Sequence, residues 1–294
     1  MAENNFSLQK TLTMLLDEKK YHSLRDILST MNPADIAAIF DDLDQACLPL
    51  LFRLLPKELA AETFVEMEPE AQELLIRGFS DSELKEVIDE LYVDDAVDIV
   101  EEMPANVVQR ILSQAEPDMR KQINEILRYP EDSAGSIMTT EYVSLRPNMT
   151  VEEAILRIRR TGIDKETIYT CYVTRGHKLI GLTSVKDLLL CEDDDATIES
   201  IMQEHVITVG TLDDKEQVAQ MFSKYNFLAL PVVDTEDRLV GIVTFDDAMD
   251  VMEDEATEDM EKMAAMLPSE HPYMRSTPIE IWKNRIPWLL LLMV

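Results

Sequence analysis

Carboxylate side chains recur along residues 246–261 at spacings that place several of them on one side of a helix. Asp246, Asp250, Asp254 and Glu258 follow one another every four residues, and the segment holds nine acidic residues and no Lys or Arg. Residues four apart are helix neighbours, and each like-charged pair costs about 0.2–0.5 kcal/mol. Hard divalent cations prefer carboxylate oxygens. The pattern predicts an acidic helix face that binds divalent cations.

Further acidic columns occur in the first half of the chain, again at four-residue spacing. They are Asp94, Asp98 and Glu102, flanked by Asp95 and Glu101, and separately Glu58, Glu62 and Glu66. The four histidines are scattered and form no cluster that would favour a softer metal. A solvated acidic surface without any metal is the alternative interpretation, because most charge runs are solvated faces.

The overall charge and the missing motifs exclude several classes of protein. The chain has 294 residues, with 58 acidic and 27 basic side chains and a net charge of −31, which excludes most nucleic-acid binders. It has no Gly-x-Gly-x-x-Gly or P-loop motif, no Gly-x-Ser-x-Gly and no His-Glu-x-x-His, so we expect no enzyme. Its three cysteines form no Cys-x-x-Cys pair and are expected to be reduced core thiols.

A repeat with an offset of 60 residues organises the second half of the chain. Residues 178–187 (KLIGLTSVKD) align with residues 238–247 (RLVGIVTFDD) at this offset, and upstream Ser136-Ile137-Met138 pairs with Ser200-Ile201-Met202 at an offset of 64. Each copy predicts a strand, a helix (151–160 or 215–224), a strand (170–174 or 229–234), a turn, a strand and a helix. The short apolar strands indicate a sheet covered on both faces. We assign Gly181 and Gly241 to a tight turn between strands.

This repeat resembles the CBS domain, a βαββα module that usually occurs in tandem pairs and that commonly associates as a dimer. The hydroxyls of Ser184 and Thr244 precede the last helix of each copy, where they would cap it, and Asp187 and Asp247 lie in its first turn. In CBS modules that bind adenosine nucleotides, these positions hold the ribose. The resemblance therefore implies ATP or another adenosine nucleotide at Ser184, Asp187 and Thr244, with capping alone as the other interpretation.

Residues 1–128 predict helices only, in a loose repeat. Asp35, Glu58 and Glu83 follow turn residues at intervals of 23 and 25 residues, which is typical of stacked helical hairpins. The stretch 129–135 breaks the pattern with Pro and Gly and predicts a linker. Past Pro268, a basic cluster and Trp288 introduce the apolar run 286–294, which indicates the start of a membrane helix with the preceding residues on the cytosolic side. A short core segment is the alternative for this run.

Taken in order, these segments resemble the cytosolic region of an MgtE-type magnesium transporter or channel. The most specific runs are residues 129–139 (YPEDSAGSIMT) and the stretch from Thr244 to Asp259. The expected fold is α+β and multidomain: a superhelical N domain (1–128), a linker (129–135), two CBS domains (136–198 and 199–250), a plug or connecting helix continuous with the last CBS helix (251–268), and a linker with the truncated first transmembrane helix (269–294).

The resemblance also implies where Mg²⁺ would bind. Carried over by motif, the ligands are Glu62, Asp94, Asp98, Asp247, Asp250, Glu255, Glu258 and Asp259. Asn226 stands before Phe227 where some relatives have Asp, and its single neutral oxygen predicts a weaker or water-mediated site there.

A gating mechanism follows from charge. Several weakly and cooperatively bound Mg²⁺ ions would bridge the acidic faces of the N domain, the CBS pair and the plug helix, and so close a pore formed by a transmembrane domain beyond residue 294. We expect the chain to form a homodimer through its CBS pair. We also expect it to be the cytoplasmic part of a bacterial inner-membrane protein. The rival interpretations are a CBS-type nucleotide sensor that regulates a transporter, and an acidic scaffold without metal.

Overall fold

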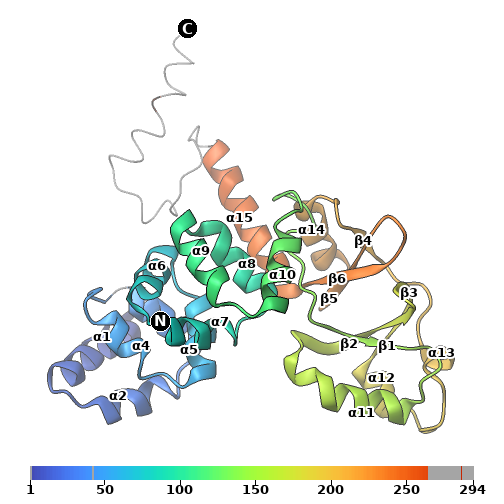
Figure 1. The fold of residues 1–294 in the computed structure, drawn as a ribbon, viewed down its shortest axis with the longest axis horizontal. Helices are drawn as coiled ribbons and strands as arrows, with labels where there is room; N and C mark the ends of the chain where they lie inside the picture. Colours follow the sequence, from blue (N-terminus) through green and yellow to red (C-terminus); the bar gives the residue numbers. More distant parts are fainter. Residues whose placement is uncertain (1, 42, 264–285, 287–294) are drawn as a thin grey trace. The chain divides into compact units, whose positions relative to one another are not determined.

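The computed structural model describes residues 2–41, 43–263 and 286, which fall into two compact units. The first unit is Met1–Arg128 and the second is Tyr129–Val294. Figure 1 shows that the first is built from helices and that all the strands belong to the second. The α+β class expected from the sequence is confirmed.

The first unit consists of short helices joined by tight turns. They are α1 (Ala2–Asp17), α2 (Tyr21–Leu28), α3 (Pro33–Asp41), α4 (Leu48–Phe52), α5 (Lys57–Val65), α6 (Pro69–Gly78), α7 (Asp81–Ile88), α8 (Val93–Glu102), α9 (Ala105–Gln114) and α10 (Pro117–Ile126). Alternate helices contact one another in the row α3, α5, α7 and α9, and α8 contacts α10. This stacking is the hairpin arrangement that the spacing of acids predicts.

The repeated acids of this unit mark helix starts. Asp35, Glu58 and Glu83 lie in the first turns of α3, α5 and α7, where the helix dipole favours negative charge. At α7 the Ser80 side chain accepts a hydrogen bond from the Glu83 backbone N–H, and the Glu83 carboxylate accepts one from the Ser80 N–H. Arg53 also pairs with Glu83 at 2.6 Å, and this bond together with the hydrogen bonds from Ser80 lowers the Glu83 pKa to about 2. Local charge therefore selects where each helix begins.

The second unit contains two three-stranded sheets of identical topology. Its elements are β1 (Tyr142–Leu145), α11 (Val151–Thr161), a 3₁₀ turn (Gly162–Asp164), β2 (Thr167–Arg175), β3 (Lys178–Ser184), α12 (Val185–Leu190), α13 (Ile198–Ile201), β4 (Val209–Gly210), α14 (Lys215–Tyr225), β5 (Ala229–Val233), β6 (Leu239–Thr244) and α15 (Phe245–Met263). In each sheet the first strand is parallel to the second, and the second is antiparallel to the third. The repeat is thus confirmed as two βαββα modules.

The two modules are tied together by the segment that precedes each of them. Thr139 exchanges two backbone hydrogen bonds with Ile242 of β6 (2.8 and 2.9 Å), and Gln203 exchanges two with Leu182 of β3 (2.8 and 3.0 Å). Each module therefore pairs with the segment that precedes the other. The backbones of Lys178 and Arg238 also form an antiparallel β-bridge where the two copies meet.

The turn role predicted for Gly181 and Gly241 is wrong. Both lie inside strands β3 and β6. A Cβ on Gly181 would approach Met202 Sδ to 2.7 Å, and one on Gly241 would approach Met138 Sδ to 2.7 Å. These positions need glycine because the crossing segment lies against the strand. The β2–β3 turn instead uses Gly176, at φ +71°.

The predicted connecting helix is present in its first part, as α15, and its continuation beyond residue 263 lies outside the described residues. The predicted membrane entrance at 286–294 also lies outside them, apart from residue 286. Within the described part of the chain, no helix combines the length and apolar character needed to cross a bilayer.

The cysteine prediction holds for one residue of three. Cys171 is buried in β2, whereas Cys47 and Cys191 are partly exposed, and all three are free thiols. Burial raises the Cys171 pKa to about 12, because the thiolate would lose its hydration.

We expect Cys171 to be alkylated at pH 8 at least about tenfold more slowly than Cys191, because the thiolate is the reactive species and is not accessible in β2. Timed iodoacetamide labelling followed by peptide mass spectrometry measures both rates, and labelling in denaturant serves as the control. Equal rates in the native protein would contradict the assignment of Cys171 to the core.

Candidate functional site

Helix α15 brings five of the predicted metal ligands onto one element. They are Asp247, Asp250, Glu255, Glu258 and Asp259. The helix follows β6 directly and packs on α14 (Figure 1). The acidic residues of α15 are therefore joined to the sheet of the second module by continuous backbone.

Apolar residues recur every three or four positions along this helix from Phe245 and Met249 onward, which predicts that these two residues lie on its buried face. That prediction is wrong in the first turns of the helix. Phe245 and Met249 are 47% and 41% exposed, whereas Ala248 and Val251 are 0% and 6% exposed and join the core with α14 and the β-sheet. The contact of α15 with α14 therefore buries the side of the helix that carries the smaller apolar residues. Met260 and Met263 are exposed as well.

Asp247 is the carboxylate of α15 most affected by its surroundings. Its pKa is raised to about 6, mainly by burial and in part by the neighbouring charges of Asp246 and Asp250. Two hydrogen bonds from Thr244, from Oγ1 (2.5 Å) and from the backbone N–H (3.2 Å), oppose this by favouring the ionised form. A cation beside Asp247 would relieve the cost that burial and its neighbours impose.

The acids in the middle of α15 have two basic neighbours, Lys215 of α14 and Lys262 of α15 itself. Lys215, at the start of α14, lowers the pKa values of Asp254 and Glu255, although burial outweighs it and both are raised overall. Glu216 and Glu258 raise the Glu255 pKa further. Glu258 forms an ion pair with Lys262 at 2.6 Å. A metal ion at Glu258 would therefore compete with a lysine, whereas Asp247 is surrounded by acids on its own helix.

The remaining predicted ligands belong to two helices of the helical unit. Glu62 is exposed on α5 with Glu58, and Glu66 caps the end of the same helix. Asp94 lies in the first turn of α8 and Asp98 one turn later. The acidic start of α8 thus has a local structural reason, the helix dipole, besides any role in binding a metal.

Ser184 and Thr244 begin α12 and α15 as predicted. Ser184 Oγ accepts from the Asp187 N–H at 3.0 Å and Asp187 Oδ2 accepts from the Ser184 N–H at 3.3 Å, which forms a complete capping box. Ser184 Oγ also donates to Asp187 Oδ2 at 2.6 Å. Thr244 and Asp247 repeat the hydroxyl–carboxylate contact in the second copy. The Ser184 hydroxyl therefore caps α12, the second copy keeps the hydroxyl–carboxylate contact, and ribose binding at these residues stays a prediction.

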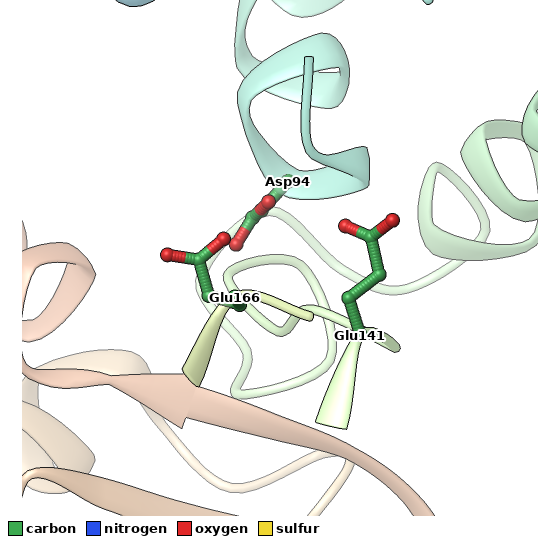
Figure 2. A group of neighbouring side chains, drawn as sticks. All are labelled: Asp94, Glu141 and Glu166. Carbon is green, nitrogen blue, oxygen red and sulfur yellow. The ribbon is translucent and has the colours of Figure 1, made fainter. Parts of the chain in front are cut away.

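Glu141 and Glu166 form a pair of carboxylates that the sequence did not identify as neighbours. Glu141 and Glu166 directly precede β1 and β2, and Figure 2 shows their side chains side by side. One oxygen of each lies within 4.8 Å of the other, and the Glu166 N–H donates to the Glu141 carbonyl at 3.0 Å. Asp94, also labelled in Figure 2, is the first-turn residue of α8 in the helical unit. The missed signal is two acids at the starts of neighbouring parallel strands.

Asn226 has a backbone reason for its identity. It ends α14 in the left-handed conformation, at φ 54° and ψ 46°, and its N–H donates to the Phe222 carbonyl at 2.8 Å. Asn adopts this conformation more readily than most residues. The side chain is exposed beyond the helix end.

Comparison with known families agrees with this arrangement of domains. Residues 31–132 match the family described as the MgtE intracellular N domain, and residues 134–192 and 198–254 each match the CBS domain.

Two longer relatives are similar to this chain over nearly its whole length. A magnesium transporter MgtE of Thermus thermophilus is 38% identical over 292 residues, which cover 98% of this chain and 64% of the relative. Magnesium transporter MgtE of Bacillus subtilis is 31% identical over 283 residues, covering 96% and 62%. The chain therefore spans less than two thirds of the length of these relatives.

Solved structures share the fold. The cytosolic domain of the Mg²⁺ channel MgtE in complex with ATP is 38% identical, with a TM-score of 0.78 over 83% of this chain and 99% of that one. The soluble part of a magnesium transporter is 33% identical, with a TM-score of 0.77 over 87% and 100%.

We expect the substitution Asp247→Asn to remove a pH dependence of stability. Because the folded pKa of about 6 lies above the unfolded value of 3.8, the folded wild type binds the proton more tightly and gains stability as the pH falls from 8 to 5. That gain is about 1 kcal/mol and should be lost in the variant.

Chemical denaturation in Mg²⁺-free buffer at pH 8 and pH 5 measures this difference. The matched control is Asp187→Asn, at the equivalent and exposed cap of the first module. An Asp247→Asn protein with the same pH dependence as the wild type would show that the Asp247 carboxyl is not the group responsible.

Proposed function

This chain belongs to the MgtE family of magnesium transporters, and from that premise we propose that it senses Mg²⁺ in the cytosol and gates the transporter's pore. The proposal is supported by the order of the matched domains and by the 38% identity to a solved cytosolic domain of the Mg²⁺ channel MgtE. The observation that carries the proposal is the acidic face of α15, on which Asp247 is held partly buried between Asp246 and Asp250.

The mechanism rests on repulsion that Mg²⁺ can remove. Two carboxylates 4 Å apart repel by roughly 4 kcal/mol at an effective dielectric of 20. With Mg²⁺ absent, the acidic helices α5, α8 and α15 resist being brought together. With Mg²⁺ bound at Glu62, Asp94, Asp98 and the carboxylates of α15, the closed arrangement becomes favourable, and the plug helix holds the pore shut.

The donor set fits magnesium. All the proposed ligand atoms are carboxylate oxygens, which hard divalent ions prefer, and none is a thiolate or an imidazole. Mg²⁺ gives up its water reluctantly and usually keeps several waters beside one or two carboxylates. Several weak sites that act together are therefore expected, which suits a sensor of an abundant ion. The closed state is favoured only by the difference in affinity between the two states.

We further propose that the chain acts as a homodimer through its CBS pair and continues into a transmembrane domain. Leu189 and Leu190, at the end of α12, are 64% and 69% exposed and would be covered in such a dimer.

The second candidate function is nucleotide sensing by the CBS pair. The paired hydroxyl and carboxylate of Ser184 and Asp187 are suited to holding a ribose, and a 38%-identical cytosolic domain has been solved with ATP. The two functions are compatible, because Ser184 and Asp187 are not among the proposed metal ligands.

Mg²⁺ is expected to compact the protein, which small-angle scattering can measure. The radius of gyration should fall on moving from chelator to millimolar Mg²⁺, but not on adding KCl to the same ionic strength. The double variant Glu255→Gln/Asp259→Asn should shift the midpoint to Mg²⁺ concentrations at least about fivefold higher.

The matched control for this variant is Asp194→Asn/Asp195→Asn, which changes the net charge equally at exposed acids of the loop after α12. Equal compaction in KCl, or equal shifts in both double variants, would mean general screening of charge and would refute a specific Mg²⁺ response.

ATP binding provides a separate test of the second candidate. Asp187→Ala should weaken ATP binding at least about tenfold, because a ribose hydroxyl loses a charged acceptor. Calorimetric titration measures the affinity, with Asp194→Asn as the control. An unchanged affinity in Asp187→Ala would leave Asp187 with its capping role alone.

A further inference from the structure

A cavity lined by arginines lies in the first CBS module, at the end of its sheet where β2 turns into β3. Its volume is about 670 Å³, within the usual 300–1,000 Å³ range of small-molecule sites. Arg146, Arg157, Arg175 and His177 line it, and none of the described residues in its lining is acidic. The lining of the cavity is therefore positively charged, whereas the chain as a whole, with 58 acidic and 27 basic residues, is strongly negative.

Three different elements bring these arginines together. Arg146 lies in the loop after β1, Arg157 lies on α11, and Arg175 ends β2. The loop is fixed in place because the Glu199 N–H donates to the Pro147 carbonyl at 2.9 Å. The cavity is therefore framed by backbone that is hydrogen-bonded independently of any ligand.

The charges of two of these arginines are not neutralised by an ion pair within the described part of the chain. Arg175 pairs with Glu199 at 2.8 Å, but Arg146 and Arg157 form no ion pair with any residue in the described part of the chain. Guanidinium groups bind phosphate oxygens through paired N–H donors. A bound anion would compensate both charges at once.

The floor of the cavity adds hydroxyls and an apolar surface. Ser144 Oγ and Thr174 Oγ1 lie 3.0 Å apart on neighbouring strands. Tyr142 donates from its hydroxyl to the Leu239 carbonyl at 3.4 Å, so the second module contributes to the same cavity. Hydroxyl donors beside arginines suit a phosphate group, and the Tyr142 ring and Leu239 offer a contact for an organic moiety.

This cavity is separate from the predicted ribose position. Ser184 stands at the far end of β3, whereas Arg175 and His177 flank the turn that begins it. Ser184 is six residue steps along β3 from Lys178, which is about 20 Å in an extended strand. A ligand at the arginines therefore need not contact Ser184 or Asp187.

We propose that this cavity is a binding site for a small phosphate-bearing anion, held by Arg146, Arg157 and Arg175. The ligand class is a pyrophosphate or a nucleotide phosphate of a size that the cavity admits. The site is additional to the Mg²⁺-sensing function and does not depend on it.

Calorimetric titration of the whole chain with sodium pyrophosphate, in Mg²⁺-free buffer of low ionic strength, tests the proposal. The wild type should bind, and Arg146→Gln/Arg157→Gln should bind at least about tenfold more weakly, because two charge-assisted contacts are lost. The matched control Arg160→Gln, an exposed arginine of the same helix outside the cavity, should stay within about twofold of the wild type. Asp187→Ala should also leave pyrophosphate binding unchanged.

A parallel titration of the Asp187→Ala protein with ADP identifies the source of the phosphate. Tighter binding of ADP than of pyrophosphate that depends on Arg146 and Arg157 supports a nucleotide, and equal binding supports an inorganic anion. No binding of either probe at millimolar concentration, or equal weakening by Arg160→Gln, would overturn the proposal. Thermal melts of each variant confirm that the fold is retained.

Discussion

Repulsion between carboxylates is the constraint on which the rest of this structure depends, because the chain carries 31 more negative than positive charges. The fold accommodates many of them at helix starts, where the dipole favours negative charge, as at Asp35, Glu58, Glu83 and Asp94. Others are paired locally, as Glu258 is with Lys262. Asp247 is the clearest exception, since burial and its neighbours raise its pKa to about 6 despite the bonds from Thr244.

That exception connects stability with function. Burial and like charges make a carboxylate unfavourable to ionise in the folded protein, and a nearby cation stabilises its ionised form. The free energy that the cation restores in this way contributes to its binding. Because α15 follows β6 without a break, the same helix joins the acidic face to the CBS pair. The proposed Mg²⁺ response is thus a consequence of where the fold leaves its charges uncompensated.

The CBS pair presents opposite charges at separate places. One end of the first module gathers Arg146, Arg157 and Arg175 around a cavity, while α15 extends from the second module with its acids. The modules are joined by the exchanged segments at Thr139 and Gln203, so a ligand at either place acts on one connected body. Such a unit can combine a cation signal with an anion signal without any contact between the two ligands.

The sequence by itself determined the features that depend on neighbours along the chain. Helix starts at Asp35, Glu58 and Glu83, the two βαββα copies and the capping pair of Ser184 and Asp187 all follow from local spacing. Local rules suffice there, because hydrogen bonds and dipoles at a helix end involve residues within one turn.

The tertiary structure alone decided what depends on packing. It selected Ala248 and Val251 instead of Phe245 and Met249 as the buried side of α15, and it placed Gly181 against Met202. It also raised the Asp247 pKa and assembled the arginine cavity from three separate elements. The spacing of residues along the chain identifies those that share a face of a helix or strand. Whether such a residue is buried, and which residues from other elements lie beside it, depends on the distant element that covers that face.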